Sequence, residues 1–153
     1  MIQIKKLITA GILVFTLNAC NNGVLLENME SNYDASTTLA KLLTLLETKG
    51  LTHFATIDHK ANATKIGLEL NADTVVIFGN PKVGTLLMQC NPSLGIDLPL
   101  RILLRTNDEG KTIVSYFNPE YWELKHNITD EKCLNILKKT KKALENMTKA
   151  ITS

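Results

Sequence analysis

Apolar and polar residues follow one another along this chain with two spacings, that of a helix and that of a strand. Leucines recur every three or four residues from Leu39 to Leu46, behind Asp34 or Ser36 as the N-cap. This spacing predicts an amphipathic helix over residues 34–49 that covers one face of a sheet.

Five other segments are typical of β-strands. Residues 51–58 alternate, 73–78 contain a β-branched run, 24–32 mix apolar and polar residues, and 101–106 and 112–117 flank a turn. The run Thr74–Phe78 has the composition of a buried central strand, and Asn107–Gly110 has that of a hairpin turn.

The second half of the chain contains the remaining predicted helices. We expect a short helix over 83–90, a short helix or turn over 119–126, and a long final helix that Thr129 opens. Asp130 and Glu131 would favour the positive N-terminal end of that helix. Its apolar stripe comprises Cys133, Leu137, Thr140, Leu144, Met147 and Ile151. Its lysine run, Lys138, Lys139, Lys141 and Lys142, is more typical of a solvated face than of a lipid contact.

This order of elements predicts an α+β fold. A strand, a helix, several strands and a final helix fit one mixed, largely antiparallel sheet with two main helices packed on it. The length of 153 residues suits one domain with a core of its own. We place this domain at residues 31–153.

The first twenty residues resemble the signal sequence of a bacterial lipoprotein. Lys5 and Lys6 precede an apolar run, and Leu17-Asn18-Ala19-Cys20 has the form of a lipobox. The apolar run is too short for a membrane span, which needs about 20 residues. We therefore expect a signal peptide over 1–19, a fatty-acylated (palmitate-type) Cys20 and a tether over 20–30. A plain secretory signal cut elsewhere remains the alternative.

The expected location is the bacterial cell envelope, with the protein anchored to the membrane and facing the periplasm or the exterior. In bacterial lipoproteins the residue after the cysteine influences sorting, and Asn21 is not the aspartate of an inner-membrane signal. The outer membrane is therefore favoured. Membrane association would occur through the N-terminal lipid.

Charge and cysteines exclude several classes of function. The chain has 17 Lys and Arg against 15 Asp and Glu, but Lys5 and Lys6 belong to the signal, so the remainder is neutral. No basic patch interleaved with aromatic residues argues for a nucleic-acid partner. No Cys or His spacing predicts a metal site, and no fingerprint predicts a cofactor.

Cys90 and Cys133 remain once Cys20 carries the lipid. An extracytoplasmic compartment permits a disulfide between them. The simpler interpretation is two buried thiols that act as small apolar groups, because a domain of this size does not need a cross-link. The sequence leaves both alternatives open.

Several segments, in the same order, resemble the domain-of-unknown-function family 302. They are Ile57–Ala61, Phe78–Met88, Leu98–Leu100, Ser115–Tyr121 and the later His126. The resemblance covers about residues 24–150. It implies a compact α+β domain, allows a homodimer and implies no agreed activity. Phe117 departs from the polar residue that members often carry there, which weakens a polar-pocket role at this position.

Candidate ligand-binding residues come from three segments. The loop Gly79–Thr85 could bind an anion through backbone N–H groups and Lys82, although glycine and proline can equally shape a turn. Histidines with neighbouring charges could act in acid–base chemistry, and amphipathic aromatics could line a pocket. The candidates are His59, Lys60, Gly79, Asn80, Lys82, Gly84, Thr85, Tyr116, Tyr121 and His126. We also expect a positive φ at Gly84.

The leading hypothesis is a lipid-anchored module that binds a small ligand or a partner protein beside the membrane. The alternative is an envelope enzyme that uses His59, Lys82 and His126 on a small anionic substrate. The alternative requires these three side chains to converge in one cleft.

Overall fold

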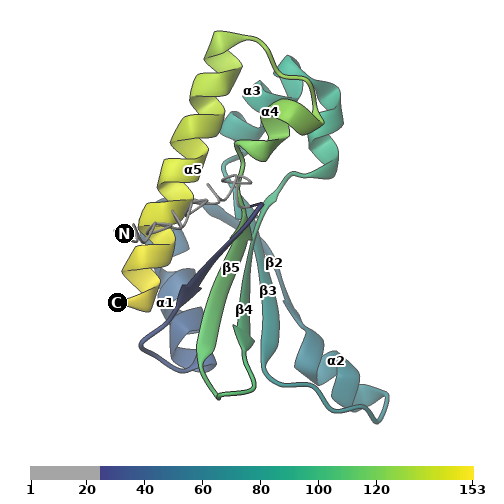
Figure 1. The fold of residues 1–153 in the computed structure, drawn as a ribbon, viewed down its shortest axis with the longest axis vertical. Helices are drawn as coiled ribbons and strands as arrows, with labels where there is room; N and C mark the ends of the chain where they lie inside the picture. The colour runs from purple at the N-terminus through teal and green to yellow at the C-terminus, as the bar shows by residue number, and fades with distance from the viewer. Residues whose placement is uncertain (1–24) are drawn as a thin grey trace, which may run out of the picture.

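The computed structural model describes residues 25–153. The predicted signal peptide and Cys20 lie outside the described residues. Eleven elements follow one another, as Figure 1 shows. They are β1 (Leu26–Glu30), α1 (Ala35–Thr48), β2 (Thr52–Asp58), α2 (His59–Lys65), β3 (Asp73–Gly79), α3 (Pro81–Cys90), the 3-10 helix η1 (Pro92–Ile96), β4 (Leu100–Thr106), β5 (Thr112–Phe117), α4 (Tyr121–Lys125) and α5 (Glu131–Thr152).

The five strands form one sheet in the order β1-β5-β4-β3-β2. Every pair of neighbouring strands is antiparallel, so the described sheet is not mixed. The β4–β5 hairpin turns at Gly110, whose φ of 79° suits a residue without a Cβ. β1 pairs with β5 at one edge, so residues 26–30 belong to the folded domain as well as to the segment we assigned to the tether.

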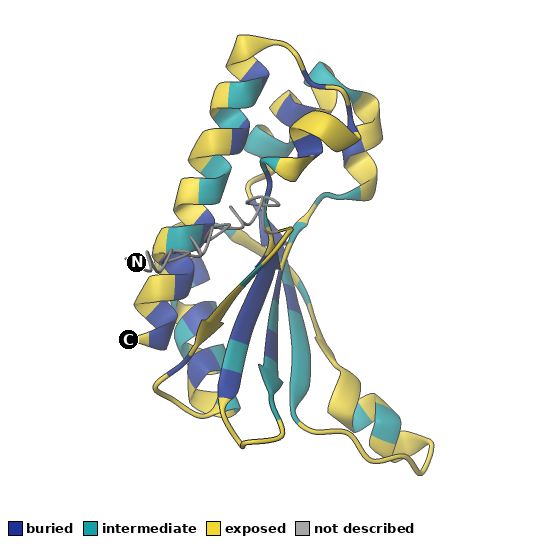
Figure 2. Ribbon diagram, in the orientation of Figure 1, coloured by how far each residue is buried: buried dark blue, intermediate teal, exposed yellow. Residues whose placement is uncertain are grey.

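Helices α1 and α5 pack on one face of this sheet and create the main core. Alternate residues of β3, β4 and β5 point to that face and are buried, as Figure 2 shows in dark blue. The predicted leucine stripe of α1 supplies Leu42 and Leu46 to the same core. The core residues are Leu42, Leu46, Val76, Phe78, Ile102, Leu104, Val114, Tyr116, Leu144, Met147 and Ile151.

A second, smaller core lies in the lobe above the sheet in Figure 1, made by α3, η1, α4 and the first half of α5. Its buried residues are Leu87, Leu94, Trp122, Ile128, Cys133 and Leu137. Leu100 packs against both cores. The 22-residue helix α5, about 33 Å long, contributes residues to both cores and so joins the lobe to the sheet.

A disulfide joins Cys90 at the end of α3 to Cys133 in the first turn of α5, with a Cα–Cα distance of 6.2 Å. The interpretation of the two cysteines as separate buried thiols is therefore wrong. The argument from domain size overlooked that the lobe has only a small core of its own. A cross-link supplements such a core.

Helix starts follow their capping residues more closely than the sequence analysis allowed. The side chain of Asp34 accepts a hydrogen bond from the Thr37 N–H, which makes Asp34 and not Ser36 the N-cap of α1. Asp130 caps α5 in the same way, so the final helix begins at Glu131 and not at Thr129. α3 begins at Pro81, two residues earlier than we expected, since proline suits the first helical position.

Helix α2 is an element that we did not predict. Asp58 caps it by accepting a hydrogen bond from the Ala61 N–H. None of its residues is buried, and it projects beyond the end of the sheet as an arm (Figure 1). In residues 25–153 no helix has the length and apolarity that a bilayer crossing requires.

We predict that loss of the disulfide destabilises the lobe. The bond closes a loop of 43 residues, and a cross-link of this span contributes about 2–4 kcal/mol to the free energy of unfolding. The double substitution Cys90→Ser and Cys133→Ser should lower that free energy by this amount in urea unfolding. Reductant should destabilise the wild type and leave the double variant unchanged. Equal stability of the two proteins would contradict the prediction.

Candidate functional site

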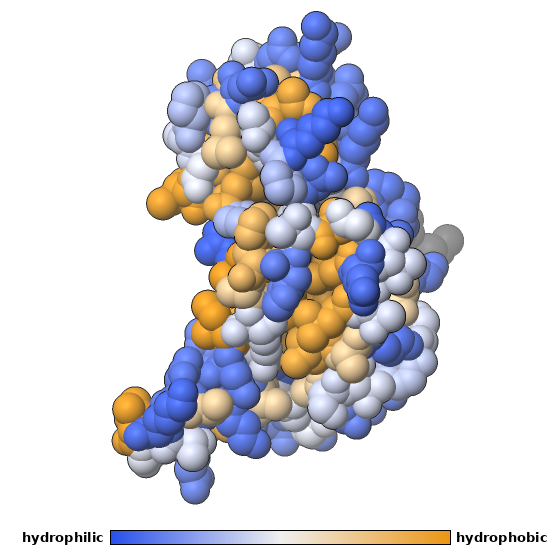
Figure 3. Space-filling model, turned by 180° about the vertical axis from the view of Figure 1, so that it is seen from behind, coloured by the Kyte–Doolittle hydropathy of each residue, from blue (hydrophilic) through white to orange (hydrophobic). Residues whose placement is uncertain are grey.

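Two apolar pockets lie at the waist of the molecule, where the lobe meets the sheet. Seen from behind, apolar residues form a strip up the middle of the molecule and also border the notch between lobe and sheet (Figure 3). The pockets share Asn80, Val83 and Leu100. We call the two pockets together the waist site.

The first pocket, which we call the Phe54 pocket, has a volume of about 270 Å³. It lies between β2, the start of α3 and the segment that leads into β4. Phe54 and Met88 are 50% and 38% exposed, so apolar surface remains open there. Its lining residues are Phe54, Gly79, Asn80, Pro81, Val83, Gly84, Thr85, Leu87, Met88, Leu98, Pro99 and Leu100.

The second pocket, which we call the Lys139 pocket, has a volume of about 290 Å³. It lies between α3, α5 and the main core. Lys139 is the charged residue of its lining. The lining residues are Leu51, Phe78, Asn80, Val83, Leu86, Leu100, Ile136, Lys139, Thr140, Ala143, Leu144 and Met147.

The polar groups at the junction of the two pockets are occupied by the start of α3. The Asn80 side chain accepts hydrogen bonds from the N–H groups of Lys82 and Val83, at 3.0 and 3.3 Å. The Gly84 N–H donates to the Asn80 carbonyl, and Pro81 has no N–H. The first turn of α3 therefore offers no free backbone N–H group. The interpretation of the Gly79–Thr85 loop as an anion-binding site thus lacks its backbone donors.

The glycines of this segment keep space open instead of supplying a strained turn. Gly84 lies inside α3 and is absent from the described glycines with positive φ, so our expectation at this position is wrong. A Cβ at Gly84 would lie 3.8 Å from the Leu98 side chain. A Cβ at Gly79 would lie 3.7 Å from the ring of Phe54. Both glycines thus leave room in the Phe54 pocket.

The structure distributes the remaining charged candidates over separate regions. Asp58 pairs with Thr74, whereas Thr52 pairs with Gly79, so His59 and Lys82 follow opposite ends of the β2–β3 pair. Those ends are roughly 17 Å apart at 3.4 Å per residue. The cleft that would unite His59, Lys82 and His126 therefore does not form.

Lys60 lies in a larger hollow of about 730 Å³, which is lined by residues of α2 and of the loop that follows it. All the lining residues of this hollow are exposed. Because its walls are exposed, the hollow does not exclude water. A ligand there would gain little free energy by exchanging its bound water for the polar groups of the hollow. We therefore do not treat it as the site.

The aromatic candidates lie away from the waist site. Tyr116 is buried in the main core. Its burial, together with the negative charges of Glu27 and Glu145, raises its pKa to about 12. Tyr121 is half-exposed at the start of α4, and neither tyrosine lines the two waist pockets. Tyr116 therefore serves packing of the main core, and neither tyrosine takes part in the waist site.

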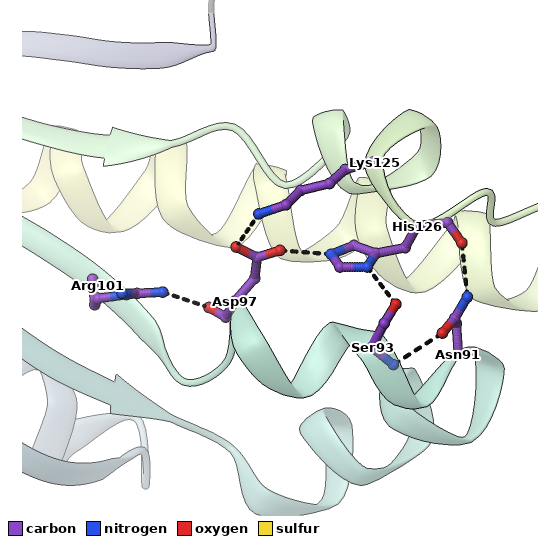
Figure 4. A network of polar contacts seen from close by, with 6 residues as sticks. All are labelled: Asn91, Ser93, Asp97, Arg101, Lys125 and His126. Carbon is purple, nitrogen blue, oxygen red and sulfur yellow. Dashed lines mark hydrogen bonds and ion pairs between the residues drawn. The ribbon is translucent and has the colours of Figure 1, made fainter.

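His126 instead belongs to a polar network in the lobe, shown in Figure 4. Its Nε2 lies 2.6 Å from Oδ2 of Asp97, and its Nδ1 lies 2.6 Å from Oγ of Ser93. Lys125 donates to the other Asp97 oxygen at 2.8 Å. Asn91 donates to the His126 carbonyl at 2.8 Å. The network fastens η1 and the chain on both sides of it to the end of α4.

The three side chains Ser93, His126 and Asp97 have the order of a nucleophile, a base and an orienting carboxylate. A ring protonated on Nε2 donates to Asp97 and leaves Nδ1 to accept from the Ser93 hydroxyl. The imidazole is only 4% exposed, whereas Ser93 is exposed, and neither residue lines the waist pockets. Catalysis needs a concavity that holds the substrate against the nucleophile, and neither waist pocket reaches Ser93, so we interpret the network as structural.

Electrostatics favour the ionised form of Asp97. Burial alone would raise the pKa of its carboxyl group. The hydrogen bonds from Lys125 and His126, together with the positive charge of Lys125, outweigh this effect and lower the pKa below its usual value. Asp97 therefore holds His126 and Lys125 as a carboxylate at neutral pH.

Sequence reasoning missed most of the residues that shape these sites. Asp97 precedes His126 by 29 residues, and no spacing pattern links them. Phe54, Leu98 and Pro99 were assigned to strands or connections without a binding role. Within residues 25–153 no group of three or more His, Cys, Asp or Glu could hold a metal ion.

We predict that Asp97→Asn destabilises the protein by about 1–3 kcal/mol, the usual cost of losing a charged partner in a part-buried network. The pKa of Asp97 is lower in the folded than in the unfolded protein, so its stabilisation is present above about pH 4. It is lost as the pH falls through the folded-state value. Urea unfolding should therefore separate wild type and variant at pH 6 and bring them together near pH 2.

The exposed turn residue Asp108 provides a control, because Asp108→Asn should change stability little at either pH. A difference between wild type and Asp97→Asn that stays constant between pH 6 and pH 2 would show that the charge of Asp97 contributes nothing.

Comparison with curated proteins finds relatives of greater length. The chain is 32% identical over 103 residues to "Fluoride-specific ion channel FluC 1" of Brucella suis biovar 1 (strain 1330), a match that covers 67% of this chain and 41% of that protein. The protein of the same name from Brucella abortus biovar 1 (strain 9-941) matches with the same identity and is covered to 38%. The chain thus spans about two fifths of the length of the curated relatives it matches.

Comparison with solved structures confirms the α+β fold. The "Crystal structure of uncharacterized conserved protein DUF302 from Bacillus stearothermophilus" superposes with a TM-score of 0.75 and 16% sequence identity. The superposition covers 84% of this chain and 98% of that one. The family described as "Domain of unknown function DUF302" matches residues 27–151. The chain therefore belongs to the DUF302 family.

Proposed function

We propose that this protein is a lipid-anchored module of the bacterial cell envelope that binds a small apolar ligand at the waist site. The observation that carries the proposal is the pair of adjoining apolar pockets, in whose lining the Asn80 side-chain oxygen and the hydroxyls of Thr85 and Thr140 are already hydrogen-bonded within the protein. Such a site has little to offer a strongly polar ligand and much to offer an apolar one.

The size of the pockets limits both the ligand and its affinity. Volumes of about 270 and 290 Å³ lie at the lower end of the range of ligand sites, about 300–1,000 Å³. Burial of about 200 Å² of apolar ligand surface contributes about 5 kcal/mol, before the cost of lost freedom. The expected Kd for one pocket is therefore on the order of 0.1–1 mM.

Binding fits the arrangement better than catalysis does. An enzyme needs titratable groups that converge on a substrate. The waist site contains none besides Lys139, and the histidine with the most elaborate hydrogen bonding is buried in the lobe. A binding module needs only the apolar concavity.

The lipobox adds a location to this function. An acyl chain on Cys20 would hold the domain at the membrane, and the residues between Cys20 and Leu25 reach at most about 18 Å even when extended. The proposed anchor therefore keeps the start of β1 near the bilayer surface. That position is favourable for a protein that receives an apolar molecule from the membrane.

We predict that filling both pockets weakens ligand binding. Gly84→Leu adds a side chain toward Leu98 in the Phe54 pocket, and Ala143→Leu fills the Lys139 pocket. Leucine is a good helix former at both positions, so the fold should persist. Titration with the fluorescent apolar probe N-phenyl-1-naphthylamine should show at least a fivefold loss of affinity in the double variant.

Gln89→Leu is the matched control, since it adds the same side chain to an exposed position of α3 that lines neither pocket. Its affinity for the probe should equal that of the wild type. Unchanged affinity in the double variant, or no binding of the probe to the wild type, would refute the proposed function.

A separate prediction concerns the anchor. Cys20→Ser removes the thiol that would carry the acyl chain, so the protein should move from the membrane fraction to the soluble envelope fraction. Metabolic labelling with an alkynyl fatty acid should mark the wild type and not the variant. Label that persists on the Cys20→Ser protein would contradict the lipobox assignment.

A further inference from the structure

The lysine run of α5 divides into paired and free residues. Lys141 lies 2.6 Å from Glu120, and this hydrogen bond raises the pKa of the lysine. Lys142 lies 3.4 Å from Glu145. Within the part of the chain that the structure describes, Lys138 and Lys139 make no ion pair. Both are exposed, but of the two only Lys139 lines a waist pocket.

The Lys139 pocket therefore combines an apolar floor with one unbalanced positive charge. No acidic residue contributes to its lining. The hydroxyl of Thr140, also in the lining, donates to the Ile136 carbonyl of its own helix, and the Asn80 oxygen caps α3. The ammonium group of Lys139 is thus the one charged group in this described lining, and no acidic side chain of the described residues pairs with it.

In the Lys139 pocket the positive charge and the apolar surface lie in different places. The residue is exposed on α5, while Phe78, Leu100 and Leu144 of the same lining are buried or partly buried. A lysine at the edge of an apolar hollow keeps its ammonium group in water and lays its aliphatic stem along the hollow. A ligand that matches both features has an anionic head and an apolar tail.

We propose that the Lys139 pocket binds a single-chain amphiphile with an anionic head group, the head at Lys139 and the hydrocarbon chain in the waist site. This inference rests on the proposed function and adds the chemical class of the ligand. Fatty acids and singly acylated phosphates share this chemistry, and both occur where an apolar chain leaves a membrane. The tail passes along Val83 and Leu100, which both waist pockets share.

Charge and chain contribute differently to this binding. The chain supplies most of the affinity through burial of apolar surface. An ion pair at a solvent-exposed ammonium contributes the equivalent of about a two- to fivefold change in Kd, and salt weakens it. The charge of Lys139 therefore selects among amphiphiles of equal chain length.

The test compares three probes of the same chain length: decanoate, decyl phosphate and the neutral 1-decanol. Binding is measured by calorimetry on the whole protein with Cys20→Ser, which needs no detergent. We expect both anions to bind more tightly than 1-decanol by about two- to fivefold. Lys139→Ala should abolish this preference and leave the affinity for 1-decanol unchanged.

Lys138→Ala is the matched control, because it removes an equal charge from the neighbouring exposed position that lines no waist pocket. The anion preference should survive in this variant. Comparison of decanoate with decyl phosphate identifies which head group the site prefers.

Each outcome has a distinct meaning. Equal binding of 1-decanol and the two anions overturns the assignment of Lys139 and leaves the proposed function standing. An equal loss in Lys138→Ala and Lys139→Ala also overturns it, since the effect is then a general one of the helix charge. Failure of all three probes to bind overturns the proposed function together with this inference.

Discussion

The Cys90–Cys133 disulfide is the constraint on which the upper half of the molecule depends. It fixes the end of α3 to the first turn of α5, while the Asn80 side chain caps the start of α3. A lobe with so small a core would gain little from packing alone, and a covalent link limits the freedom of its unfolded chain. Because both ends of α3 are fixed, space remains on two of its sides, and this space forms the two waist pockets.

The waist site results from the fixed position of α3 next to both cores. Its two pockets lie between the cores of lobe and sheet, and Leu100 packs against both cores. Apolar side chains such as Phe54 and Leu86 stay partly exposed there, although burial would favour folding. The polar network around Asp97 holds η1 to α4 within the lobe, and none of its residues lines the waist pockets.

Hydrophobic spacing was sufficient to predict most elements. The leucine stripe of α1, the buried strand β3, the β4–β5 hairpin and the stripe of α5 all form as expected, because their patterns arise from burial on one face. The arm helix α2 was missed, since a short polar helix with no buried residue has no such pattern. The positive φ expected at Gly84 failed because Asn80 and Pro81 start a helix there.

The amino-acid sequence by itself determined most element types and the α+β class, since these depend on residues close together in the chain. The lipobox-like segment on which the proposed location rests is equally local, and it stays a prediction. Only the tertiary structure decided that Cys90 meets Cys133, that Asp97 meets His126, and that Gly79, Gly84 and Lys139 border adjoining hollows. These contacts join residues tens of positions apart. Their formation depends on the path of the backbone and on packing between elements, which no local spacing records.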